Sequence, residues 1–324
     1  MTKKIFPFLA AAAMMLLTAC YHDQHEEMPS EYGDQPVGYL TPLLLWEEQA
    51  DTAGNATTID DIRFTVSGTG GTTVANRFNN TESAADWLQQ LPVGEYDLLV
   101  TADMDEAHGY VLENVGADTR STTRADEATV TTALPDIRVS LSDPSSSPRQ
   151  SWYAVTHATV KEDEITVAEF HLQRLLSELS VIVSNVPTGA AITASVERVA
   201  RDVLLTHRDG QGRYGVADRE DYMTVSLGAL AADPADAATL RHDDHTLMPT
   251  AGGQERCYLT LNVTTPEGTR LTYLADAPRM ECGKVYVVEL DYTKLHPYML
   301  LSAFTINDWT EGWTISGEII NPDR

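Results

Sequence analysis

The first residues whose types and spacing suggest chemistry lie at positions 17–20. Leu17 is followed by the small residues Thr18 and Ala19 and then by Cys20. Small residues let a peptidase approach the backbone, and a cysteine thiolate is the group that accepts an acyl chain. This is the pattern of a lipoprotein signal peptide. It predicts cleavage between Ala19 and Cys20 and lipidation of Cys20, for example with palmitate.

The residues before this motif fit the same interpretation. Lys3 and Lys4 form a basic start, and the apolar run 5–17 is shorter than the ~20 residues that cross a bilayer. Residues 1–19 are therefore predicted to be a signal peptide; an ordinary secretory signal with a chance cysteine is the alternative. Residues 20–37 are polar and acidic, which is typical of a flexible tether. The tether would link the protein to a membrane through more than one acyl chain, since one chain binds only marginally.

Two further clusters have residue types that bind metals. Hard oxygen ligands at Asp103, Asp105 and Glu106 suit calcium, but the EF-hand spacing is absent. The segment 242–245 (HDDH) has no third partner nearby in sequence, and a solvated loop is the favoured interpretation. Phosphate loops, His-Glu-x-x-His and Gly-x-Ser-x-Gly are also missing from the sequence. We therefore expect no enzyme activity, no cofactor and no metal.

The remaining candidates are cysteines and tryptophans. Cys257 and Cys282 lie in expected neighbouring strands and could form a disulfide in an oxidising compartment, or remain two separate buried thiols. Trp309 and Trp313 are spaced four apart and could bind a glycan or host protein as exposed aromatics, or pack in a seam. The pair 152–153 (WY) is open to the same two interpretations.

The charge balance restricts the partners. The chain has 22 Lys and Arg against 48 Asp and Glu, a formal net charge of −26. Such a surface repels nucleic acid, which we exclude as a partner. Acidic residues spread this evenly are better explained by solvation than by a binding device.

The body of the chain is rich in short alternating runs, such as 62–66 and 94–100, separated by Gly, Pro, Asn and Asp. Regular alternation of strands and helices is absent, so we predict an all-β fold of sandwiches. The Ser- and Pro-rich stretch 142–151 indicates a domain boundary. The predicted units are a β-sandwich over 38–150, a second over 151–300, and a strand-like appendage over 301–324.

Several motifs together resemble a known family. They are 91–96 (LPVGEY), 170–181 (FHLQRLLSELSV), 281–290 (ECGKVYVVEL) and 306–309 (INDW). With the lipoprotein signal and the acidic tether, the chain resembles the fimbrillin superfamily of Bacteroidota lipoproteins, which build or anchor type V pili. The resemblance implies two tandem transthyretin-like β-sandwich domains, other fimbrillin-like subunits as partners, adhesion, and a place on the outer membrane at the cell surface.

The resemblance also implies a test of role. Polymerising subunits of that family lose an N-terminal strand to an arginine-directed protease, and a neighbour's segment fills the groove by strand addition. Here no Lys or Arg lies between Cys20 and Arg63. Arg63 is the candidate maturation site, although a strand residue facing water is the favoured interpretation. We therefore expect an anchor-like subunit, with a glycan- or host-binding surface lipoprotein as the alternative. The segment 299–320 would either be donated to a neighbour or complete its own sandwich.

Overall fold

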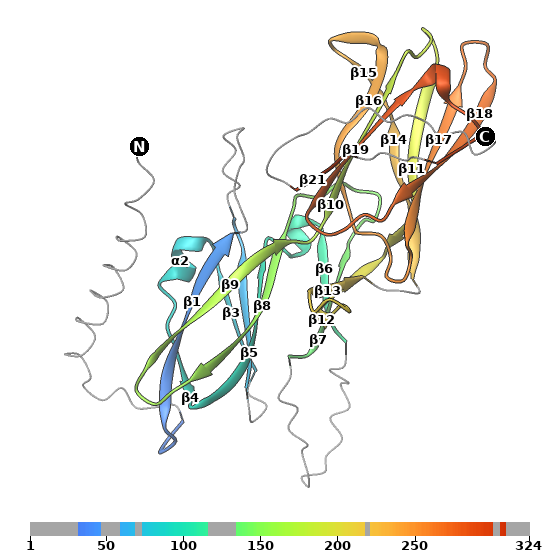
Figure 1. Cartoon of the computed structure of the whole chain (residues 1–324). Coiled ribbons are helices and arrows are strands. Elements are labelled where there is room, and N and C mark those ends of the chain that lie inside the picture. The colour runs from blue at the N-terminus through green and yellow to red at the C-terminus, as the bar shows by residue number, and fades with distance from the viewer. Residues whose placement is uncertain are drawn as a thin grey trace, which may run out of the picture.

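The structure, a computed structural model, describes residues 32–46, 59–68, 73–115, 134–217, 221–300 and 305–308. Strands dominate this part of the chain (Figure 1), which confirms the predicted all-β fold. Its helical elements are short: α2 (Thr81–Ala85), η1 (Glu106–His108) and η2 (Tyr292–Lys294). No helix within these ranges is long and apolar enough to cross a membrane. The predicted sites at Ala19, Cys20, Trp309 and Trp313 lie outside the described residues.

The first unit is a seven-stranded sheet with the order β3-β2-β5-β8-β9-β1-β4. Its strands are β1 (Val37–Trp46), β2 (Ile62–Gly68), β3 (Thr73–Phe78), β4 (Gln89–Pro92), β5 (Gly94–Ala102), β8 (Trp152–Val160) and β9 (Ile165–Arg174). Ile62, Phe64 and Val66 alternate along β2 and are all buried. A strand of period two places such residues on one face, so this face of the sheet forms a core.

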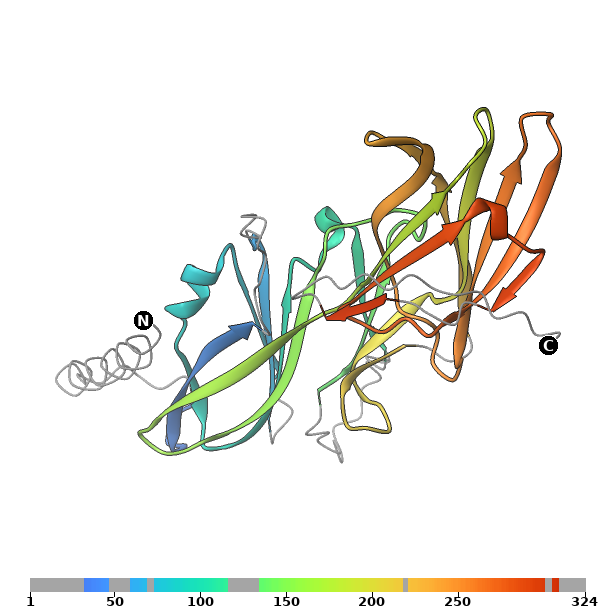
Figure 2. The same ribbon diagram turned by 45° about the horizontal axis from the view of Figure 1, so that its top comes forward.

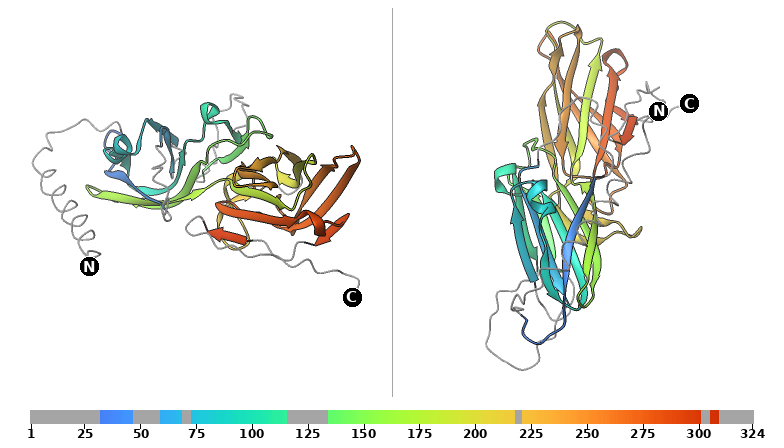
Figure 3. Two further views of the ribbon diagram at one scale, coloured as in Figure 1. Left: turned by 90° about the horizontal axis from the view of Figure 1, so that it is seen from above. Right: turned by 90° about the vertical axis from the view of Figure 1, so that its left-hand side faces the viewer.

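This sheet curls over that core. Phe64 on β2 and Phe170 on β9 have ring centroids 5.7 Å apart, although β5 and β8 separate the two strands in the sheet. Three strand spacings in a flat sheet would amount to about 14 Å. The β4-β1-β9 end therefore folds over the β3-β2-β5-β8 part, as the left view in Figure 3 shows. Trp87, just after α2, stacks on Phe64 at 5.1 Å and extends the core.

A second sheet packs against the opposite face of β5 and β8. It has four strands in the order β13-β12-β7-β6, namely β6 (Tyr110–Val115), β7 (Asp136–Leu141), β12 (Asp202–Arg208) and β13 (Tyr214–Ala217). Leu99 and Tyr153 belong to the same buried cluster as Ile137 and Val139 of this sheet. The Tyr153 hydroxyl donates to the Tyr214 carbonyl at 2.9 Å. A hairpin from the second half of the chain thus completes a sheet of the first half.

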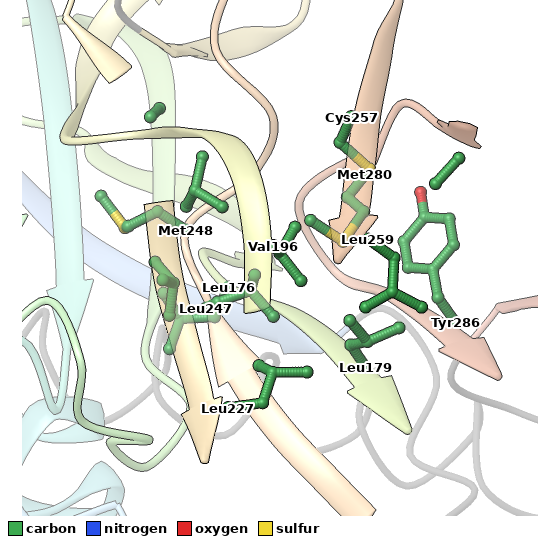
Figure 4. Packing of buried hydrophobic residues seen from close by; sticks show 14 of the residues in the cluster. Leu176, Leu179, Val196, Leu227, Leu247, Met248, Cys257, Leu259, Met280 and Tyr286 are labelled. Atoms are coloured by element: carbon green, nitrogen blue, oxygen red, sulfur yellow. The ribbon is translucent and has the colours of Figure 1, made fainter. Parts of the chain in front are cut away.

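The second unit is a sandwich of two five-stranded sheets, β15-β16-β10-β19-β21 and β14-β11-β17-β18-β20. Figure 4 shows part of its core, where side chains from both sheets meet. The strands are β10 (Ser177–Ser184), β11 (Ala191–Ala200), β14 (Tyr222–Ala229), β15 (Ala231–Asp233), β16 (Asp236–Leu247), β17 (Arg256–Thr264), β18 (Arg270–Pro278), β19 (Lys284–Asp291), β20 (Tyr298–Leu300) and β21 (Thr305–Asp308).

The position of the predicted domain boundary needs correction. β8 pairs with β5 over its whole length, and β9 pairs with β1, so the first unit extends to Arg174. The stretch 142–151 is a connection from β7 to β8 and not a linker between units; Gln150 and Ser151 within it are buried. The predicted appendage also begins too late, because β20 starts at Tyr298.

The contact between Gly215 and Tyr153 should limit what the β12–β13 hairpin tolerates. A Cβ at Gly215 would lie 2.0 Å from the Tyr153 hydroxyl oxygen, and the φ of Gly215 is +89°. We expect Gly215→Ala to lower the free energy of unfolding by about 2 kcal/mol or more, measured by urea denaturation. Gly212→Ala is the matched control, because Gly212 has φ +81° but no atom within 4 Å of its built Cβ. Equal losses for the two variants would contradict the proposed close contact.

Candidate functional site

The candidate assembly site is the position of β1 in the first sheet, beside β9 and β4. β1 lies between two strands: it runs parallel to β9 over residues 39–46, paired with 165–172, and antiparallel to β4 over residues 37–40. The Tyr39 N–H donates to the Glu164 carbonyl at 2.9 Å, and the Asp163 N–H donates to the Val37 carbonyl at 3.0 Å. β1 is therefore hydrogen-bonded from its first residue, with β4 beside it as far as Leu40 and β9 beside it to its end.

Pro42 fits this seat without a lost hydrogen bond. Because the Tyr39 N–H points to β9, the alternation of a strand sends the N–H groups of even-numbered residues to the β4 side. Pairing with β4 ends at Leu40, so none of the described strands faces the nitrogen of residue 42. Proline has no N–H to donate, and no strand pairing at this position requires a donor. The proline thus stiffens β1 and leaves its pairing with β9 intact.

Arg63 lies in the middle of a three-strand array, not at an accessible turn. It pairs with Arg77 of β3 on one side and Thr101 of β5 on the other. Its guanidinium contacts the carboxylates of Asp61 at 3.0 Å and Asp105 at 3.3 Å. The next residue, Phe64, is buried in the core. Cleavage after Arg63 would require β2 to leave the sheet first, which supports the interpretation of Arg63 as a strand residue.

The carboxylates that suggested calcium have other partners. Arg77 forms ion pairs with Asp61 and, at 2.8 Å, with Asp105. Asp103 accepts backbone N–H donors from Asp60 and Asp61 at 2.8 and 3.0 Å. Within the described ranges no group of three or more His, Cys, Asp or Glu side chains is arranged to hold a metal ion. Arginines compensate the charge of Asp105, and backbone amides that of Asp103.

Asp105 is the centre of this ion-pair network. It caps η1 by accepting from the His108 N–H at 3.1 Å, and it contacts His108 Nδ1 at 2.6 Å. Burial acts to raise the pKa of Asp105, but the hydrogen bonds from His108 and the charges of His108 and Arg63 outweigh burial, so the pKa lies below its ordinary value. The carboxylate is the favoured form in the folded protein.

The histidines of 242–245 lie in β16, so the expectation of a solvated loop is wrong. His242 Nε2 and His245 Nδ1 are 3.1 Å apart. His245 is buried, and burial followed by the neighbouring His242 lowers the pKa of His245 to about 4. The ring is therefore neutral at pH 7 and belongs to the interior of the sandwich.

The expected disulfide does not form, because Cys257 and Cys282 are both thiols. They do not lie in neighbouring strands: Cys257 is on β17, whereas Cys282 is in the turn before β19, which belongs to the other sheet. Burial raises the pKa of Cys257 to about 11 and that of Cys282 to about 12. The alternative of two separate thiols is the one observed, with Cys257 buried and Cys282 partly buried. Trp152 and Tyr153 are likewise buried packing residues.

The end of the described chain occupies one edge of each sheet of the second unit. β20 pairs in parallel with β18, and β21 pairs antiparallel with β19. β20 and β21 thus complete the sandwich from which they come, which agrees, for the described part of the terminal segment, with the second of the two expectations. The first and last described strands are both held by their own chain.

The curled first sheet and the stacked sheets of the second unit make this a β-sandwich protein. Its first and last described strands both pair within its own sheets. The family model of the fimbrillin-A associated anchor proteins Mfa1 and Mfa2 matches residues 55–313. The match covers most of the chain. The protein belongs to this family, which confirms the resemblance inferred from its motifs and supports a role as a fimbrial anchor or adhesin-like surface protein.

Three of the solved structures that match the chain come from Bacteroides thetaiotaomicron and Porphyromonas gingivalis. A candidate adhesin from Bacteroides thetaiotaomicron matches with 12% identity and TM-score 0.50, over 85% of this chain and 97% of that one. The fimbrial anchor protein Mfa2 from Porphyromonas gingivalis matches with 15% identity and TM-score 0.47, over 84% and 98% of the two chains. The tip fimbrial protein Mfa3 of that organism matches with 11% identity and TM-score 0.40, over 85% and 100%. No curated protein sequence matches the chain.

The two thiols give a direct chemical prediction. Because burial keeps Cys257 and Cys282 protonated, iodoacetamide should label neither appreciably in the folded protein at pH 8. In 6 M guanidinium without any reductant, both should be labelled, as counted by intact-mass spectrometry. A chain that takes up labels at these positions only after reduction would contain the disulfide and would contradict the structure.

The depressed pKa of Asp105 predicts how stability depends on pH. A carboxyl group whose pKa is lower in the folded state stabilises that state above the unfolded pKa, and this contribution is lost as the pH falls through the folded value. Asp105→Asn should therefore cost about 1 kcal/mol near pH 7, because the arginine partners are partly solvent-exposed. The difference between variant and wild type should shrink as the pH falls below the ordinary value of 3.8. The difference in stability is measured from the midpoints of urea denaturation at a series of pH values, with Glu106→Gln as the control variant. A stability difference that does not change with pH would argue against the ion pairs.

Proposed function

We propose that this protein is a lipid-anchored fimbrial anchor subunit that keeps its first strand permanently. In this proposal Cys20 carries acyl chains in the outer membrane, the protein faces the cell exterior, and the folded units hold other fimbrillin-like subunits by strand complementation. The role is structural and not enzymatic. Membership of the anchor family supports the general role, and the arrangement around β1 supports the anchor over the shaft.

One observation carries the proposal: β1 lies between β9 and β4, and no Lys or Arg lies between Cys20 and Arg63 at which a basic-specific protease could remove it. Arg63 itself is paired on both sides and held by Asp61 and Asp105. A shaft subunit of the fimbrillin type must lose its N-terminal strand to open a groove. This chain has the strand and the occupied groove, and its sequence between Cys20 and Arg63 contains no basic residue.

Glycan or host-protein binding through Trp309 and Trp313 is the second hypothesis. Both residues lie outside the described part of the chain, so the structure offers no observation in its favour. Trp152 and Tyr153 of β8, the other candidate aromatics, are both buried. We therefore keep adhesion as an expectation of the family and not as a separate function of a known surface.

The test is the intact N-terminus of the protein extracted from its native outer membrane. We expect mass spectrometry to find an acylated Cys20 joined to an uncut chain through Phe64. A chain that begins at Phe64 would overturn the anchor role, and an unacylated N-terminus at another residue would overturn the lipid anchor.

A matched pair of variants tests whether the absence of a basic residue is what protects β1 from an arginine-specific protease. Asn55→Arg places an arginine in segment 47–58, between β1 and β2, where the natural chain has none. We expect an arginine-specific protease to cut this variant within segment 47–58, and to leave that segment uncut in both the wild type and Asn55→Gln, as peptide mapping by mass spectrometry would show. Equal resistance of Asn55→Arg would mean that sequence alone does not protect β1.

A further inference from the structure

Each unit pairs its first strand in parallel with its last long strand. In the first unit β1 pairs with β9 through eight residue pairs, Tyr39–Trp46 with Ile165–Leu172. In the second unit β10 pairs with β19 through seven, Glu178–Ser184 with Val285–Asp291. All other strand pairings in the described chain are antiparallel, except the short parallel contact between β18 and β20. The same arrangement therefore occurs twice, at the two places where the chain enters and leaves a unit.

Parallel pairing fixes how these strands respond to tension along the chain. A pull on the start of β1 acts at one end of the strand pair, and a pull on the end of β9 acts at the opposite end. The two strands are then sheared, so all inter-strand hydrogen bonds carry load together. In an antiparallel pair the same two points would lie at one end, and the bonds would break one at a time. From this geometry we propose that β1–β9 and β10–β19 are two mechanical clamps in series that let the folded chain bear tension.

The junction between the clamps transmits load without a flexible linker. Figures 1 and 2 show β9 leading directly into β10 along one line. Only Leu175 and Leu176 separate the strands, and both are buried. The Leu175 N–H donates to the Ser151 carbonyl at 2.9 Å, and the Leu176 N–H donates to Gln150 Oε1 at 2.8 Å. Tension leaving β9 therefore reaches the first residues of β10.

The C-terminal strands add a weaker element in the same path. β21 pairs with β19 through four antiparallel residue pairs, and its last residue, Asp308, lies opposite Lys284 at the start of β19. Tension on the C-terminal end would peel β21 off before the β10–β19 clamp is loaded. The load path is useful to the cell only if the proposed anchoring role holds, but the clamp is a property of the folded chain alone.

The first test compares two pulling directions on the same wild-type sequence by single-molecule force spectroscopy. The mature chain, from residue 21 and without lipid, is pulled between its two ends, or between its N-terminus and a handle at Glu162. Glu162 lies in the turn before β9, beside the start of β1, where the Asp163 N–H bonds to the Val37 carbonyl. End-to-end pulling should shear β1–β9 and rupture it at a several-fold higher force than pulling at Glu162, which peels the same bonds singly.

The second test identifies the clamp that yields. Release of residues 37–174 should lengthen the chain by roughly 45 nm, at about 3.4 Å per residue. Leu43 and Glu169 are paired residues, so Leu43→Cys with Glu169→Cys, in a chain whose Cys257 and Cys282 are replaced by serine, should form a cross-link across the clamp. The oxidised chain should lose most of that lengthening, and reductant should restore it. The serine-only chain is the control.

The outcomes separate this proposal from the proposed function. Equal rupture forces in the two pulling directions, or a lengthening unaffected by the cross-link, would overturn the clamp. Neither result would bear on lipid anchoring, which the mass of the native N-terminus decides. A high force end to end from a chain that lacks acylation in the cell would keep the clamp and reject the anchor.

Discussion

The seat of β1 is the constraint on which the first unit depends. β1 supplies the only strand between β9 and β4 in the described sheet, and its inward residue Leu40 belongs to the core that Phe64 and Phe170 share. Without β1, one edge of β9 would expose unpaired backbone groups over residues 165–172, and the apolar groove beneath would open to water. Any state of this protein that lacks β1 must have another strand in its place.

Little in the sequence reveals that seat, because its partner lies far along the chain. The run 37–46 is broken by Pro42, which argues against a strand in a simple alternation pattern, and its partner β9 begins at residue 165. The runs 62–66 and 94–100, in contrast, were predictable as strands, because their buried residues alternate regardless of which strand is the partner. The local alternation of buried residues is enough to predict an all-β fold. The order and register of the strands, and with them the closure of the sheet, depend on pairings between distant parts of the chain.

The errors of the sequence interpretation have similar physical origins. The Ser- and Pro-rich stretch 142–151 has the composition of a linker, but Gln150 uses its amide to bind both backbone groups of Leu176 and is buried for that reason. The acidic residues Asp103 and Asp105 have a spacing suited to calcium, whereas Arg77, the ion-pair partner of Asp105, comes from β3 and cannot be recognised from the neighbouring sequence. Polar residues that bond to distant parts of the chain resemble solvated residues until the fold is known.

The hairpin β12–β13 makes the two units mechanically and thermodynamically dependent on each other. It leaves the second unit, pairs with β7 through Asp202–Leu204, and places Gly215 against the Tyr153 hydroxyl of the first unit. The largest buried cluster continues through both units, from Leu99 and Tyr153 to Leu259 and Tyr286. Two domains joined by a flexible linker would reorient under tension, because few contacts would fix their relative position. A shared sheet and a shared core prevent this reorientation, so the protein carries force through its strands, from the acidic N-terminal segment to the edge where its last strands lie.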